Sequence, residues 1–171
     1  MTPVSLRIAT ITSSDTRTRD TDEGGALLGE LLREGGHDVS LALIVPEDPT
    51  RLGSMVRVLA DSDRFAAIVV TGGTGVGPRD RTARELRPLF RRSIDGFGEL
   101  FRQLSFAEIG PRGVLSNALA GVVGTTVVYA IPGSLKAIRL ATTKLILPTI
   151  EHTVDLANGR TAHGAHGAKS P

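Results

Sequence analysis

A glycine-rich segment at residues 71–80, with the sequence TGGTGVGPRD, has the clearest potential for chemistry in this chain. Four glycines within six residues allow the backbone to adopt positive φ angles and to approach a ligand closely. Successive N–H groups in such turns form a concave anion site. Thr71, Thr74 and Arg79 would add hydroxyl donors and positive charge. The segment therefore predicts a phosphate-binding loop, and the alternative is a plain turn between a strand and a helix.

Two familiar phosphate-binding motifs do not fit this loop. A Walker A loop ends in Gly-Lys-Ser/Thr, whereas this loop continues into Pro78, Arg79 and Asp80. The dinucleotide-binding motif needs a glycine at the position of Pro78. A different kind of phosphate site is expected.

Asp80 needs a separate explanation, because a carboxylate beside a phosphate site repels the ligand unless a cation lies between them. Magnesium takes oxygen ligands from carboxylates and phosphates together, so Asp80 is predicted to bind Mg²⁺ jointly with the substrate phosphates. The alternatives are a helix N-cap or a salt bridge from Asp80 to Arg79 or Arg81.

The elements that must position this loop follow from hydrophobic periodicity and turn signals. Continuous apolar runs predict strands at residues 6–12, 38–45, 65–71 and 125–131, and a short strand at 114–115. Helical spacing predicts helices at residues 26–34, 49–59, 82–90 (broken near Pro88), 97–106 and 134–147, the last with Ser134 as its N-cap.

Strands that alternate with helices, several of them continuously apolar, predict an α/β sandwich with a mostly parallel sheet. Ligands of such sheets bind at the carboxyl ends of the strands. Three strands here end in polar or glycine-rich turns, at residues 13–15, 71–77 and 132–134. If these strands are neighbours, their turns form one site. A single domain is expected over residues 1–157, followed by a disordered glycine-, alanine- and histidine-rich tail at 158–171.

Composition narrows the function further. The formal charge of +2 and the absence of tryptophan argue against nucleic-acid binding. The chain has no cysteine, no apolar run long enough to span a membrane and no leader pattern, so we expect a cytoplasmic protein. No histidine lies near the polar turns, and no metal site built from protein ligands alone is expected.

Several segments together resemble the MogA/MoaB family of molybdopterin-binding proteins. The loop and its continuation PRDRT are similar to the family pattern TGGTG…PRD-x-T. The segments SD at 14–15 and DEGG at 22–25 resemble its N-terminal element. The stretch GFGELFR at 96–102, LSF at 104–106 and EIG at 108–110, and PGS at 132–134 with KA at 136–137, also match. The last two matches favour the MoaB branch.

The resemblance implies a three-layer α/β/α sandwich and a homotrimer or homohexamer. It also implies an enzyme that transfers AMP from MgATP to the terminal phosphate of molybdopterin. Asp80 falls on the acidic position for catalysis and Mg²⁺, and Glu47 or its neighbour Asp48 on a second one. The implied substrate-binding residues are Ser14, Asp15, Thr71, Gly72, Gly73, Thr74, Gly75, Arg79, Ser116, Pro132, Gly133 and Ser134.

Two positions depart from the family pattern. Glu47 is one methylene longer than the usual aspartate, and Asn117 replaces an arginine that follows the serine at 116. The loss of that guanidinium removes a bidentate partner for a phosphate or carboxylate. A protein that binds or delivers molybdopterin without turnover is therefore the main alternative, and a nucleotide hydrolase or regulator with the same fold is a third.

Overall fold

The computed structural model describes residues 4–160, which form one six-stranded sheet with the strand order β2-β1-β3-β6-β5-β4. The four strands β2, β1, β3 and β6 run parallel to one another, β5 is antiparallel to β6, and β4 is antiparallel to β5. The prediction of a mostly parallel sheet is confirmed. The strands are β1 (Arg7–Ser13), β2 (Asp38–Val45), β3 (Ala67–Thr71), β4 (Arg92–Ser93), β5 (Leu119–Val123) and β6 (Thr126–Ile131).

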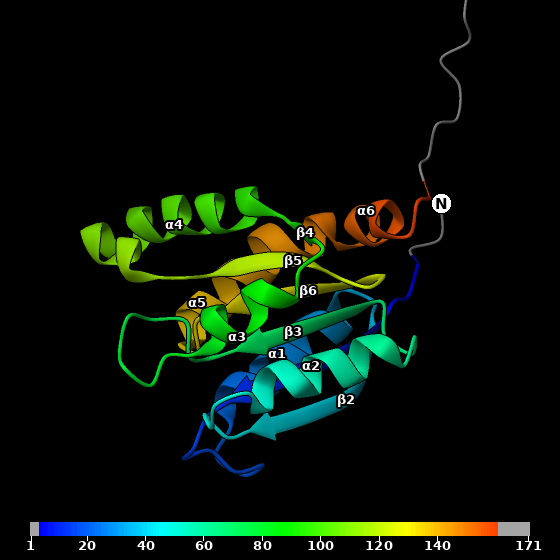
Figure 1. The fold of residues 1–171 in the computed structure, drawn as a ribbon. Coiled ribbons are helices and arrows are strands. Elements are labelled where there is room, and N and C mark those ends of the chain that lie inside the picture. The colour runs from blue at the N-terminus through cyan, green and yellow to red at the C-terminus, as the bar shows by residue number, and fades with distance from the viewer. Residues whose placement is uncertain (1–3, 161–171) are drawn as a thin grey trace, which may run out of the picture.

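Helices cover both faces of the sheet, which gives the three layers visible in Figure 1. One hydrophobic core lies between the sheet and α1, α4, α5 and α6, and a second lies between the opposite face and α2 and α3. The predicted α/β/α sandwich is confirmed. The helices are α1 (Glu23–Glu34), α2 (Arg51–Asp61), α3 (Thr82–Leu86), α4 (Asp95–Ile109), α5 (Leu135–Ala141) and α6 (Leu147–Ala157).

The predicted short strand at residues 114–115 is wrong, because these residues end the 3₁₀ helix Gly110–Leu115. The real strand, β5, begins at Leu119 and pairs with β6 across a tight turn at Gly124, which has φ +60°. Gly121 lies inside β5 against the ring of Phe90, where a Cβ would come within 2.3 Å of the ring. A glycine in a strand weakens the local strand signal, which explains why β5 was missed.

Several helical predictions need correction in length. α4 covers Asp95–Ile109 rather than 97–106, and α3 ends at Leu86, before the 3₁₀ turn Arg87–Leu89 that contains Pro88. α1 begins at Glu23 rather than 26, because the Asp22 carboxylate caps it by accepting from the Gly25 amide (2.8 Å). The predicted helix at 134–147 is α5, capped by Ser134 as expected, which continues through a π-helical turn, Thr142–Ile146, into α6.

Residues 158–160, the start of the predicted tail, continue from the end of α6 and are hydrogen-bonded to the rest of the fold. The Asn158 side chain donates to the Val154 and Thr125 carbonyls, and the Arg160 amide donates to the Asp155 carbonyl. The remainder of the predicted tail, residues 161–171, lies outside the described residues. Over residues 4–160, no helix combines the length and apolar character that crossing a bilayer requires.

The sheet register brings the polar turns together, as predicted. Thr12 of β1 pairs with Thr71 of β3, and Thr71 pairs with Ile131 of β6, so three parallel strands end side by side. On the other side of β1, Ser13 pairs with Val45, which places the start of the 46–48 turn at the same edge. Every predicted site residue on these turns therefore lies at the carboxyl edge of the sheet.

Candidate anion-binding site

The loop after β3 requires glycine at its first two positions. Gly72 has φ +96°, and a Cβ there would lie 2.5 Å from the Ser13 carbonyl oxygen. Gly73 has φ +63°, and a Cβ there would lie 2.5 Å from Thr82 Oγ1. Both the backbone conformation and the close packing exclude a side chain. The loop is thus built against β1 and the start of α3.

Four consecutive carbonyl oxygens of this loop accept hydrogen bonds from two residues. The Thr82 hydroxyl donates to the Gly72 carbonyl (2.7 Å), and the Thr82 amide donates to the Gly73 carbonyl (3.0 Å). The Asn117 amide donates to the Thr74 carbonyl (2.7 Å), and its side-chain Nδ2 donates to the Gly75 carbonyl (2.9 Å). All four carbonyls are therefore directed into the protein.

The N–H groups that follow these carbonyls point the opposite way, because N–H and C=O are antiparallel in a trans peptide and the described chain has no cis peptide. They belong to Gly73, Thr74, Gly75 and Val76. Among residues 4–160, none of these four amides donates to a protein acceptor, whereas the Gly72 amide donates to the Ile131 carbonyl (3.0 Å). Four uncommitted amides on one side of a loop can bind an anion.

Asp80 folds back over the end of the loop. Its Oδ2 accepts from the Gly77 amide (2.8 Å), and a Cβ at Gly75 would lie 2.6 Å from the same oxygen. Helix α3 has Arg81 at its N-cap position without a side-chain cap, and Asp80 forms no ion pair within the described residues. Neither alternative suggested by the sequence, an N-cap or a salt bridge, is observed.

Arg79 bridges two acidic residues from other turns. Its guanidinium forms a hydrogen-bonded ion pair with Asp15 and lies 3.7 Å from Glu47 Oε2 (Nε to Oε2). Asp15 also accepts from the Glu47 amide (2.8 Å), and this bond, followed by Arg79, lowers the pKa of Asp15. Burial and the neighbouring Asp15 charge raise the pKa of Glu47, and Arg79 partly opposes this. Asp48 instead pairs with Arg51 (3.3 Å) and is exposed, so Glu47 is the acidic residue that faces the loop.

A small cavity of about 110 Å³ lies where the turns after β1, β3 and β6 meet the start of α1. Ser14, Gly72 and Gly133, which the sequence predicts to bind substrate, are among the residues that line it. Arg17 and Asp22 line it too, and they were missed as site residues. Asp22 had a usable signal, because an aspartate directly before a helical pattern is a typical N-cap. Its other oxygen accepts from Thr12 Oγ1 (2.6 Å), which joins α1 to β1.

Several predicted hydroxyl groups serve the fold at this edge. Thr71 Oγ1 donates to the Pro132 carbonyl (3.3 Å), and Ser134 Oγ accepts from the Ala137 amide (3.3 Å). Ser14 Oγ accepts from the amides of Thr16 and Arg17 (both 3.2 Å). These oxygens shape the turns that surround the loop.

In two further predicted residues, the hydroxyl group is either hydrogen-bonded within the protein, as in Ser116, or buried, as in Thr74. Ser116 Oγ accepts from the Ala118 amide (3.2 Å), beside Asn117, so Ser116 lies one residue from the loop contacts. Thr74 is buried, with 3% of its surface exposed. The main chain of the loop, rather than its threonine side chains, is thus the accessible source of donors.

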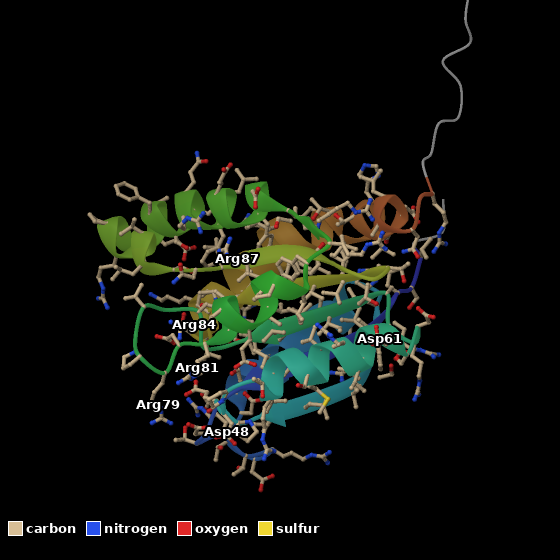
Figure 2. All side chains as sticks on the ribbon, in the orientation of Figure 1. Asp48, Asp61, Arg79, Arg81, Arg84 and Arg87 are labelled. Carbon is tan, nitrogen blue, oxygen red and sulfur yellow. The ribbon has the colours of Figure 1, made fainter. Side chains whose placement is uncertain are left out.

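Positive charge follows the loop along the chain. Figure 2 shows Arg79 on the loop, Arg81 where the chain enters α3, and Arg84 and Arg87 further along this segment. In the part of the chain that the structure describes, no group of three histidine, cysteine, aspartate or glutamate side chains is arranged to hold a metal ion. That the protein has no metal site built from its own side chains alone stays a prediction.

The fold and the site define a class: α/β/α sandwich proteins with a glycine-rich loop at the carboxyl edge of a mixed sheet. A family model described as a probable molybdopterin binding domain matches residues 9–152. Molybdenum cofactor biosynthesis protein B of Bacillus anthracis is 42% identical over 151 residues, covering 88% of this chain and 89% of the relative. The protein of the same name from Bacillus subtilis is 40% identical over 153 residues, covering 89% and 90%.

Solved structures agree with these matches. A crystal structure of a molybdenum cofactor biosynthesis protein B superposes with a TM-score of 0.88 at 39% identity, covering 93% of this chain and 99% of the other. The tungsten cofactor synthesizing protein MoaB from Pyrococcus furiosus gives 0.79 at 30% identity, with the same coverage. The chain belongs to the MoaB/MogA family of molybdopterin-binding-domain proteins, and its relatives support a role in molybdenum cofactor biosynthesis.

Proposed function

We propose that this protein is a molybdopterin adenylyltransferase, which binds molybdopterin through its terminal phosphate at the glycine loop and transfers AMP to it from MgATP. The observation that carries the proposal is the anchoring of the four carbonyls of Gly72–Gly75, which leaves four successive amides uncommitted on the other side of the loop. Such amides bind a phosphate without adding a charged side chain. Asp80 lies beside them.

The proposed step is a nucleophilic displacement at phosphorus. A terminal phosphate oxygen of molybdopterin forms a bond to the α-phosphorus of ATP. The bond from that phosphorus to the α–β bridging oxygen breaks, and pyrophosphate leaves with the electron pair. A phosphate monoester has its second pKa at about 6, so the nucleophile is largely ionised at neutral pH without a general base. The protein's part is positioning and charge stabilisation.

The residues at the loop fit a Mg²⁺ ion that arrives with the substrate phosphates. Magnesium commonly takes one or two carboxylates together with phosphate oxygens and water. The Gly77 amide donates to Oδ2 of Asp80, and Oδ1 is left for a cation. Burial, then the charge of Asp15 and, less strongly, that of Asp80 raise the pKa of Glu47. Glu47 is the second candidate ligand, because Arg79 holds it on the side of the loop. When bound, the ion would neutralise charge at the phosphates.

Pyrophosphate release tests the proposal. ATP, Mg²⁺ and molybdopterin together should release pyrophosphate and form adenylylated molybdopterin, and omission of any one should stop the reaction. Asp80→Asn keeps the shape of the side chain and should lower the rate at least ~100-fold. Asp61→Asn, an exposed change at the end of α2, is the matched control and should leave the rate unchanged. Turnover in Asp80→Asn equal to wild type would exclude the proposed role of Asp80.

A binding or delivery protein without turnover is the second candidate, favoured by two observations. Asn117 supplies no positive charge where the family pattern has arginine, and Arg79 is already engaged by Asp15 and Glu47. This candidate predicts tight binding of molybdopterin with no pyrophosphate release at any ATP concentration. Equilibrium binding and turnover measured on one preparation separate the two.

We also propose that the protein is cytoplasmic and forms a homotrimer or a homohexamer. Large apolar side chains are exposed on α4 and just after it, among them Phe106 (59%), Ile109 (50%) and Val114 (73%). Large apolar side chains exposed on one segment of the chain are consistent with a protein interface. Sedimentation equilibrium should give a mass three or six times that of the chain, and a monomer would refute this part.

A further inference from the structure

Asn117 lies between the 3₁₀ helix Gly110–Leu115 and β5, and hydrogen bonds hold the backbone next to it in place. The preceding Ser116 carbonyl accepts from Arg102 Nη1 of α4 (3.4 Å), and the Ser116 hydroxyl accepts from the Ala118 amide (3.2 Å). Ala118 is buried, with 3% exposure. Asn117 is therefore held by α4 and the sheet, rather than by the loop that it contacts.

From this position Asn117 fixes two consecutive peptide planes of the glycine loop. Its main-chain N–H holds the Thr74 carbonyl (2.7 Å), and its side-chain amide holds the Gly75 carbonyl (2.9 Å). The N–H groups in the same planes belong to Gly75 and Val76, and they point away from Asn117. Val76 is itself exposed (69%), so its side chain does little to fix this plane.

We infer that Asn117 is a positioning residue for the bound phosphate: its side-chain amide holds the Gly75 carbonyl away from the anion and thereby presents the Val76 N–H to it. This inference rests on the proposed function. If the plane were free to turn, the Gly75 carbonyl would present a partial negative charge to the ligand in place of a donor. The neutral Asn117 amide thus favours anion binding by orienting a backbone N–H, whereas the arginine of the family pattern would contribute a positive charge.

Asn117→Leu keeps the approximate shape of the side chain and removes its hydrogen-bond donor. The main-chain bond to the Thr74 carbonyl remains, so only one plane is released. The affinity for molybdopterin should fall about tenfold, as expected for a lost hydrogen bond that also leaves a polar group without a partner. Because no charge is removed, the ratio of wild-type to variant affinity should stay constant between roughly 0.05 and 0.5 M salt, on either side of physiological ionic strength.

Asn158→Leu is the matched control, because Asn158 also donates its side-chain amide to main-chain carbonyls, those of Val154 and Thr125. It should unfold more easily but bind molybdopterin as the wild type does. Amide hydrogen exchange of the ligand-free protein adds a second readout. Exchange across residues 73–77 should be faster in Asn117→Leu and unchanged in Asn158→Leu.

Isothermal titration of molybdopterin into the three folded proteins decides the matter. Weakened binding in Asn117→Leu alone, constant across salt, supports the inference. Equal affinity of Asn117→Leu and wild type overturns it while the proposed function stands. A loss that disappears at high salt also overturns it, because the effect would then be electrostatic. Absence of binding in the wild type removes the proposed function, and this inference with it.

Discussion

The Asp80 carboxylate lies directly over Gly75, so close that a single added methyl group on Gly75 would come within 2.6 Å of Asp80 Oδ2. The same oxygen accepts the Gly77 amide at 2.8 Å. Glycine at 75 therefore leaves room for the Asp80 carboxylate in this position, and no positive φ angle is involved. The sequence alone suggested another reason, namely that a side chain here would block the approach of the ligand to the backbone.

Gly75→Ala should displace Asp80 and lower the rate of AMP transfer by about 100-fold, since small displacements of catalytic groups have effects of this size. Gly96→Ala is the control, because a Cβ at Gly96 meets no atom within 4 Å. Pyrophosphate release measures the rates, and thermal melts show that both variants fold. A Gly75→Ala enzyme with wild-type turnover would contradict the proposed placement of Asp80.

Arg79 is expected to act by neutralising Asp15 and Glu47 rather than by binding the phosphate itself. Arg79→Gln should weaken molybdopterin binding about two- to fivefold, in keeping with the modest energies of exposed ion pairs. Adding Asp15→Asn should restore most of that loss, because it removes the charge that Arg79 balanced. No restoration in the double variant, measured by titration calorimetry, would mean that Arg79 contacts the ligand directly.

Thr82 should matter for stability as well as for binding. It is buried (1% exposed), and its hydroxyl donates to the Gly72 carbonyl at 2.7 Å. Thr82→Val preserves the shape but leaves that carbonyl without its partner, which should cost about 1–3 kcal/mol of unfolding free energy. Thr82→Ser keeps the hydroxyl and should recover most of the hydrogen-bond contribution. Urea unfolding compares the two, and equal losses would show that the hydrogen bond contributes little.

His37 should make the fold sensitive to mild acid. Its Nδ1 accepts from the Leu6 amide (3.4 Å), and burial lowers the pKa of His37 below its ordinary value of 6.5, against the opposing charge of Glu151. The unfolded chain then binds the proton first as the pH falls. Stability is therefore complete above pH 6.5 and decreases as the pH drops below it, towards the lowered folded pKa.

His37→Asn tests this pH dependence, because the asparagine oxygen can accept from the Leu6 amide and does not titrate near neutrality. The variant should lose less stability than the wild type when the pH is lowered from 7.5 to about 5.5, the range in which an ordinary histidine titrates. His152→Asn, at an exposed position of α6, is the control and should behave like the wild type. Thermal melts across this range give the comparison. Parallel curves for His37→Asn and wild type would rule out His37 as the source.

Some elements were predictable because their signals are local. The strands β1, β2, β3 and β6 were each predicted within two residues at either end. For β1, β3 and β6 the reason is burial on both faces, which requires a continuous apolar run. The glycine loop was also predictable, because only glycine tolerates the φ angles at 72 and 73. β5 was not predictable, because the local strand signal of Leu119–Val123 is weak. The strand forms through its pairing with β6 and its packing against Phe90, which are contacts between distant residues.

The sequence by itself determined the layer architecture, the three strands that end in polar or glycine-rich turns, and the glycine loop, since these depend on short-range patterns. The tertiary structure decided that the three strands are neighbours, so that their turns meet. Only the tertiary structure decided how that loop is oriented. Asn117 reaches Gly75 from 42 residues away, and Arg79 meets Asp15 across 64. The direction of a peptide plane depends on which distant donor holds its carbonyl, and no local pattern records that partner.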